Sequence, residues 1–154
     1  MKYPELETAI LNLVIAASDE SAAAFGAATI TRLLREEAVE DAVPDELSED
    51  AWAALAAARA SILTVDAGEL GALIERIDAG ILVDDDLDRG IVAALTALMH
   101  WNSYLQGGRR GELYELAIRS IEDVDFQVSA DLDDMLATPE MAAEYDRIRG
   151  LLTS

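Results

Sequence analysis

The chain has 154 residues, no cysteine and a formal net charge of −20, because 31 Asp and Glu residues outnumber 11 Lys and Arg residues. This length suits one domain with a hydrophobic core, and the lack of cysteine excludes disulfides and thiolate metal sites. Strong negative charge repels phosphate backbones and anionic lipids, so we expect neither nucleic acid nor a membrane as a partner. A basic protein would be attracted, but solubility or adaptation to salt explains the same charge without any partner.

The composition predicts an all-α fold. Alanine occupies 28 positions, and it is the residue that loses least on entering a helix. Apolar residues recur about every 3.6 positions in successive segments, which predicts a compact single-domain bundle of about seven helices over residues 1–154. No segment has the roughly 18 uncharged apolar residues of a membrane span, and Glu5 and Glu7 stand where a secretory signal would be basic. We therefore expect a cytoplasmic protein.

Capping residues mark the starts of the first three helices. The first is entered through Pro4, a residue tolerated in a first turn. Ser18 is placed to cap a second helix, which we expect to end near Val39. An acidic loop at about 40–48 follows, and Ser48 starts the third helix.

Later helices carry similar signals. Asp66 and Glu69 have the spacing of a capping box and predict a fourth helix that Gly80 ends. Thr138 as cap and Pro139 at the first position predict the start of the last helix.

The fifth helix, around residues 85–106, differs from the others. Between Ile91 and Leu105 only His100 can carry a charge, and apolar residues occupy both sides of the helix. A helix that is apolar all round is normally buried, so we expect a central helix ended by Gly108.

His100, Asn102 and Tyr104 of this helix are candidate binding residues. An imidazole can act as a general base, but it needs a nucleophile or an orienting carboxylate, and its helical neighbours are Thr96, Ala97, Ser103 and Tyr104. We favour packing in a helix interface for His100, and we expect Asn102 to form a hydrogen bond to the backbone of a neighbouring helix. The sequence assigns no catalytic residue, and it favours a protein that is not an enzyme.

Arg109 and Arg110 form the one pair of adjacent arginines. Arginine's planar fork suits the binding of an anion or of a partner's carboxylate, which makes both residues candidate binding residues. With so many carboxylates in the chain, we favour an internal ion pair as the explanation for both arginines.

The segment LVDDDLDRG places Asp84, Asp86 and Asp88 at alternate positions, as in a calcium loop. The pattern then fails, because Arg89 stands where glycine is required and Leu95 where a bidentate Glu is needed. Aspartates before a helix cap its N-terminus and oppose its dipole. We therefore predict helix capping here, and neither a metal nor a cofactor.

Several segments resemble a known family. The segment IVAALTALMHWNSYL, with GGRRGELY, ELAIRSIEDVDFQV and TPEMAAEYDRIRGLL after it, resembles the second half of the YjaG-like bacterial family. AAAFGAATITRLL, AWAALAAARA and ELGALIERID resemble its first half in shortened form. The resemblance implies an all-α domain from a bacterium, and it implies no activity.

Three functions remain open. The first is an interaction module, of the inhibitor or immunity type, that binds a basic partner through an acidic helical surface. The second is a self-associating bundle, a homo-oligomer without a catalytic role, which Trp52, Trp101 and Tyr104 suggest if they form an exposed apolar patch. The third is a small-molecule binder or enzyme with a pocket near His100. The first is preferred, because the charge is extreme and no catalytic motif is found.

Overall fold

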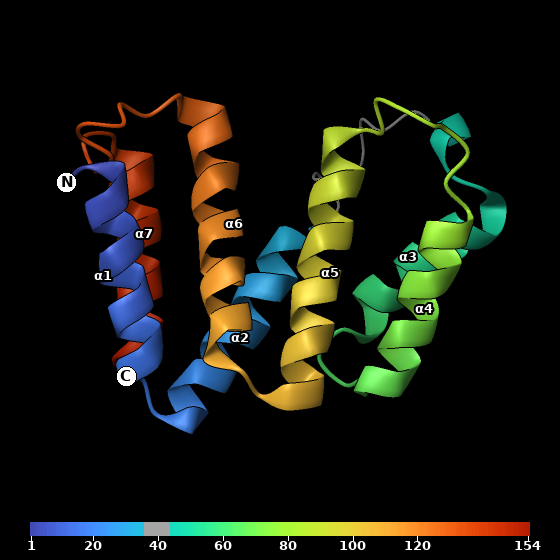
Figure 1. Cartoon of the computed structure of the whole chain (residues 1–154), viewed down its shortest axis with the longest axis horizontal. Coiled ribbons are helices and arrows are strands. Elements are labelled where there is room, and N and C mark those ends of the chain that lie inside the picture. The colour runs from blue at the N-terminus through green and yellow to red at the C-terminus, as the bar shows by residue number, and fades with distance from the viewer. Residues whose placement is uncertain (36–43) are drawn as a thin grey trace. The chain divides into compact units, whose positions relative to one another are not determined.

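The computed structural model describes residues 1–35 and 44–154, and the described residues contain seven α-helices and no named strand (Figure 1). The predicted all-α class and number of helices are therefore confirmed. None of the helices in the described ranges is long and apolar enough to cross a membrane. In chain order they are α1 (Tyr3–Ala16), α2 (Asp19–Leu33), the short 3-10 helix η2 (Pro44–Glu46), α3 (Glu49–Ser61), α4 (Ala67–Ala79), α5 (Arg89–Gly107), α6 (Arg110–Val128) and α7 (Pro139–Leu152).

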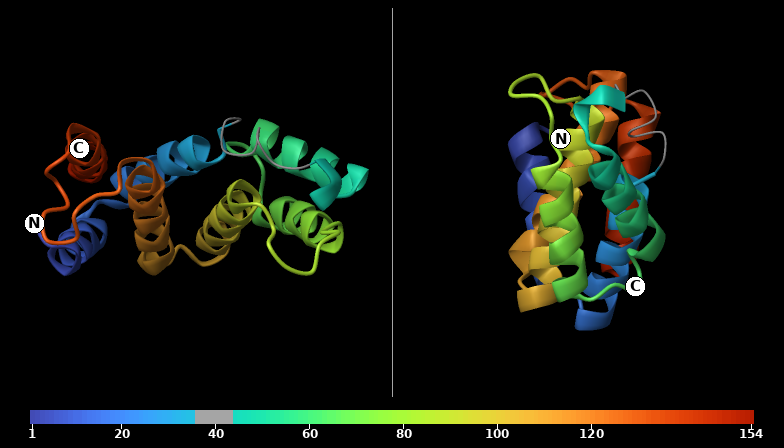
Figure 2. Two further views of the ribbon diagram at one scale, coloured as in Figure 1. Left: turned by 90° about the horizontal axis from the view of Figure 1, so that it is seen from above. Right: turned by 90° about the vertical axis from the view of Figure 1, so that its right-hand side faces the viewer.

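The contacts within the structure define two compact units. Unit 1 comprises residues 1–29 and 109–154, and unit 2 comprises residues 30–108. In unit 1, α1 lies beside α6 and α7, and in unit 2, α4 packs against both α3 and α5 (Figures 1 and 2). One division falls inside α2 and the other between α5 and α6. That residues 1–154 behave as a single domain stays a prediction.

The predicted caps are present. Ser18 Oγ accepts a hydrogen bond from Ser21 N at 3.0 Å, and Ser48 Oγ accepts one from Ala51 N at 3.1 Å. Asp66 and Thr138 cap α4 and α7 in the same way. Each satisfies a backbone N–H that the first turn of a helix leaves without a partner. Local signals in the sequence therefore place most helix starts correctly.

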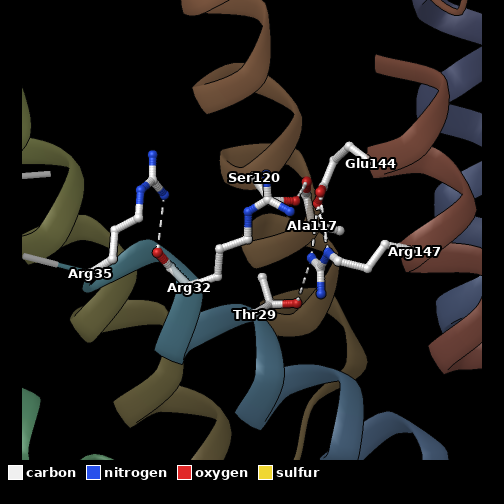
Figure 3. A network of polar contacts seen from close by, with 7 residues as sticks. All are labelled: Thr29, Arg32, Arg35, Ala117, Ser120, Glu144 and Arg147. Carbon is white, nitrogen blue, oxygen red and sulfur yellow. Dashed lines mark hydrogen bonds and ion pairs between the residues drawn. The ribbon is translucent and has the colours of Figure 1, made fainter. Parts of the chain in front are cut away.

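The end of α2 was predicted wrongly. The helix ends at Leu33, not near Val39. Arg35 Nη1 donates to the Arg32 carbonyl at 3.1 Å (Figure 3). Arg59 Nε donates to the Leu34 carbonyl at 2.7 Å. These arginines satisfy carbonyls that a longer helix would bond internally.

The acidic loop expected at about 40–48 has structure in its second half. Pro44–Glu46 form η2, and buried Leu47 pairs with Ile81 in an isolated bridge, while residues 40–43 lie outside the described ranges. Gly80 ends α4 as predicted. A side chain at this position would collide with Ser48 and Ala51 at the N-terminal end of α3. The N-terminal end of α3 and the C-terminal end of α4 are therefore closely packed.

Helix α5, the predicted fifth helix, is shorter than predicted, and part of its apolar surface is exposed to solvent. It begins at Arg89, not near residue 85, because the Asp88 carboxylate accepts hydrogen bonds from Gly90 N and Ile91 N and so caps it. Val92 is 45% exposed and Met99 is 54% exposed. The expectation of burial on both sides is therefore wrong at these positions, because periodicity reveals apolar side chains but not whether a neighbour covers them. The buried positions of α5 are Ile91, Ala94, Ala97, Leu98 and Trp101.

A buried ion pair crosses the core of unit 1. Glu144 of α7 is only 2% exposed, and Arg147 donates to its carboxylate three times, at 2.8 to 3.1 Å. Arg147 Nη2 also donates to Thr29 Oγ1 at 3.1 Å (Figure 3). The guanidinium lies over the Phe25 ring, 5.9 Å from its centroid. This network joins α7 to α2, and its hydrogen bonds offset the cost of burying the charges.

We predict that Arg147→Met lowers the free energy of unfolding by about 1.5–3 kcal/mol, because it removes the charge-assisted hydrogen bonds that this arginine donates to a buried carboxylate. Arg149→Met is the matched control: Arg149 pairs with Asp146 on the same helix, at the same spacing and the same 2.8 Å, but both side chains are exposed. Arg149→Met should lower the free energy of unfolding by at most about 1 kcal/mol. Urea unfolding measures both, and equal losses would contradict the prediction. Glu144→Met/Arg147→Met should recover part of the lost stability.

Candidate functional site

The candidate binding residues of α5 are only partly accessible. His100, Asn102 and Tyr104 are all half-buried, so His100 is neither fully enclosed nor open to solvent. Tyr104 stacks on Trp101, with ring centroids 5.5 Å apart and planes at 26°. Trp101 itself is buried. The aromatic residues that suggested self-association therefore form no fully exposed patch.

Asn102 does not have the expected bond through its carbonyl oxygen. Asn102 Oδ1 is buried and accepts no hydrogen bond from the described residues. The amide nitrogen lies beside Gly71 of α4, where a Cβ at position 71 would sit 3.5 Å from Nδ2. A buried carbonyl without a donor costs about 1–3 kcal/mol, so a water molecule or a ligand N–H or O–H is the natural complement of this atom.

Arg109 and Arg110 have different roles although they are adjacent. Arg110 Nη1 donates to the carbonyls of Val14 and Ala17 at 2.7 and 2.8 Å, and Arg110 Nη2 donates to Asp19 Oδ1 at 2.8 Å. The guanidinium thus holds the C-terminal end of α1, where positive charge is favoured, and the start of α2. The side chain of Arg109 is 76% exposed and lies 4.0 Å from a Glu112 oxygen. The internal alternative is confirmed for Arg110, and Arg109 lies on the surface.

Of the aspartates before α5, Asp88 caps the helix as predicted, whereas Asp84, Asp85 and Asp86 are exposed. Among the residues that the structure describes, no group of three His, Cys, Asp or Glu side chains is arranged to hold a metal ion.

A different surface of unit 1 brings acidic and aromatic side chains together. We call it the α1–α6 strip, and it consists of Tyr3 and Glu7 from α1 with Tyr114, Glu115, Arg119 and Glu122 from α6. Arg119 lies 3.8 Å from a Glu115 oxygen and 3.2 Å from a Glu122 oxygen. Two carboxylates therefore flank one guanidinium, and with Glu7 the strip holds three carboxylates and one arginine, so it is negative as a whole.

The two tyrosines report this negative environment. Burial raises the pKa of the Tyr3 phenol, and Glu7 and Glu122 raise it further. Burial also raises the pKa of Tyr114, with Glu7 contributing both as a charge and as a hydrogen-bond partner. Both phenols therefore stay protonated beside carboxylates, and the Tyr114 hydroxyl donates its hydrogen bond to Glu7.

The residues of the strip were not among the sequence candidates. Glu115, Arg119 and Glu122 stand at spacings of four and three, which places them on one side of a helix, and this signal could have been found. That Tyr3 and Glu7 lie opposite them depends on the packing of α1 against α6, which the sequence does not show.

Comparison with known proteins identifies no relative: no protein-family model matches the chain, and neither a curated protein nor a solved structure does. The resemblance to the YjaG-like family therefore stays a prediction.

We predict that Arg110→Met lowers the free energy of unfolding by about 1.5–3 kcal/mol, because hydrogen bonds from a charged donor to three oxygens are lost. Arg109→Met is the matched control, because it removes a positive charge from the adjacent surface residue. It should change the free energy of unfolding by at most about 0.5 kcal/mol. Thermal and urea unfolding of the two variants measure the difference. A larger loss in the Arg109 variant would refute the internal role of Arg110.

We also predict that Glu7→Gln lowers the pKa of Tyr114 toward its usual value of about 10 without reaching it, because the effect of burial remains. The raised pKa means that the folded state favours the neutral phenol. The neutral phenol therefore contributes its full stability below the pKa of the unfolded chain, and this stability is lost as the pH rises through the pKa of the folded protein. Ultraviolet titration, with Tyr114→Phe to assign the signal, measures the shift. Glu20→Gln, on α2, is the control and should leave the titration of Tyr114 unchanged.

Proposed function

We propose that this protein is an interaction module that binds a basic protein through the α1–α6 strip. The observation that carries the proposal is an excess of carboxylates beside two half-buried tyrosines: Glu115 and Glu122 flank Arg119, and Glu7 lies beside the tyrosines. Tyrosine is enriched in protein interfaces because its ring packs while its hydroxyl forms hydrogen bonds. Carboxylates in such a surface attract and orient a basic partner.

The placement of other arginines supports this proposal. Arg110 is bound to main-chain carbonyls and Asp19, and Arg147 to the buried Glu144. Both are engaged inside unit 1 and do not balance the strip. A module of this kind works by covering a surface of its partner, as an inhibitor or immunity protein does, and needs no catalytic residue. A cytoplasmic location and a bacterial origin belong to the same proposal.

The test measures binding of a labelled amphipathic peptide with lysines and leucines at helical spacing, called here the lysine–leucine peptide. We expect Glu115→Gln/Glu122→Gln to weaken binding by about tenfold. Asp84→Asn/Asp85→Asn removes the same total charge from exposed positions of unit 2 and should weaken binding by less than about twofold.

Fluorescence anisotropy at about 0.05 M and 0.3 M salt gives the affinities, and binding through the strip should fall with salt. Equal weakening in the two double variants would show that only net charge matters and would overturn the proposal. Failure of the unaltered protein to bind the peptide at low salt would overturn it as well.

A further inference from the structure

Two exposed apolar side chains lie beyond the end of the strip, one on the last turn of α6 and one in the turn that follows. Phe126 follows Glu122 by four residues and Arg119 by seven, so it extends the same side of the helix. Its side chain is 63% exposed, and Leu132, in the turn between α6 and α7, is 62% exposed. Exposed apolar side chains of this size beside charged groups are typical of interaction sites.

The turn that carries Leu132 is held in place by several contacts. Ala130 N donates to Asp125 Oδ1 at 2.8 Å, which joins the turn to α6. Tyr3 N donates to the Leu132 carbonyl at 2.9 Å, and Met135 is fully buried. Because Tyr3 belongs to the strip, Leu132 is attached directly to it. A surface that is already ordered loses little entropy when a partner binds.

The charges around these two side chains determine which kind of partner can bind there. Asp131, Asp133 and Asp134 flank Leu132 and are all exposed. A second copy of the chain carries the same net charge of −20 and is repelled, as is an anionic membrane. A segment with apolar residues between lysines or arginines fits both the apolar side chains and the carboxylates.

We propose that Phe126 and Leu132 are the apolar anchor of the α1–α6 strip and dock the apolar face of a basic amphipathic segment of a partner protein. This inference rests on the proposed function and specifies the partner: charge alone does not suffice, and apolar residues must lie between the basic ones. Glu115 and Glu122 bind the basic side chains, and the anchor slows dissociation.

The test compares the lysine–leucine peptide with a second peptide in which glutamine replaces every leucine. Phe126→Ser and Leu132→Ser should each weaken binding of the lysine–leucine peptide by about tenfold, and should leave binding of the lysine–glutamine peptide unchanged. Ile15→Ser is the matched control, because Ile15 is 62% exposed in unit 1 but stands twelve residues, about 18 Å of helix, from Tyr3. It should change either affinity by less than about twofold.

The outcomes separate the two proposals. If the lysine–leucine peptide depends on Glu115 and Glu122 but binds the Phe126 and Leu132 variants as tightly as the unaltered protein, the anchor is refuted and the proposed function stands. If the unaltered protein binds neither peptide, the proposed function itself fails. Circular dichroism checks that each variant is folded, and either serine variant alone suffices if the other unfolds. A dimer of the unaltered protein in sedimentation that Phe126→Ser dissociates would make a second copy the occupant and overturn the inference.

Discussion

Repulsion among carboxylates is the constraint under which this chain folds. With a net charge of −20, each arginine that enters the interior is withdrawn from the surface it could neutralise. Unit 1 places Arg147 against a buried carboxylate and Arg110 against the end of α1. These contacts join α7 to α2 and α6 to α1, so two of the few basic side chains contribute to the packing of the helices. The α1–α6 strip is the clearest local result of that distribution.

Much of the fold could be read from the sequence because its signals are local. A cap such as Ser18 or Thr138 acts within one helical turn, and the structure contains both. The end of α2 could not be read in this way, because it depends on Arg59, an arginine from another helix, which bonds the Leu34 carbonyl. The exposure of Met99 is of the same kind, since it depends on which surface a neighbouring helix leaves uncovered.

The candidate site was harder to predict than the fold. Arg109 and Arg110 are indistinguishable in the sequence, and only the position of the α1 carbonyls shows which of them is internal. Asn102 was expected to form a hydrogen bond to the backbone of a neighbouring helix, and its Oδ1 has no partner among the described residues. The strip combines residues more than a hundred positions apart, so the spacing within α6 could suggest only half of it.

The division of the chain into units has a consequence for synthesis. Unit 2 is one continuous stretch, 30–108, and a ribosome delivers all of it before any of α6 or α7 exists. Helix α1 leaves the ribosome first, yet the helices that lie beside its buried side chains Leu6, Ile10 and Val14 are translated last. For most of translation this apolar face is uncovered, and the acidic residues of the emerging chain help to keep it from aggregating.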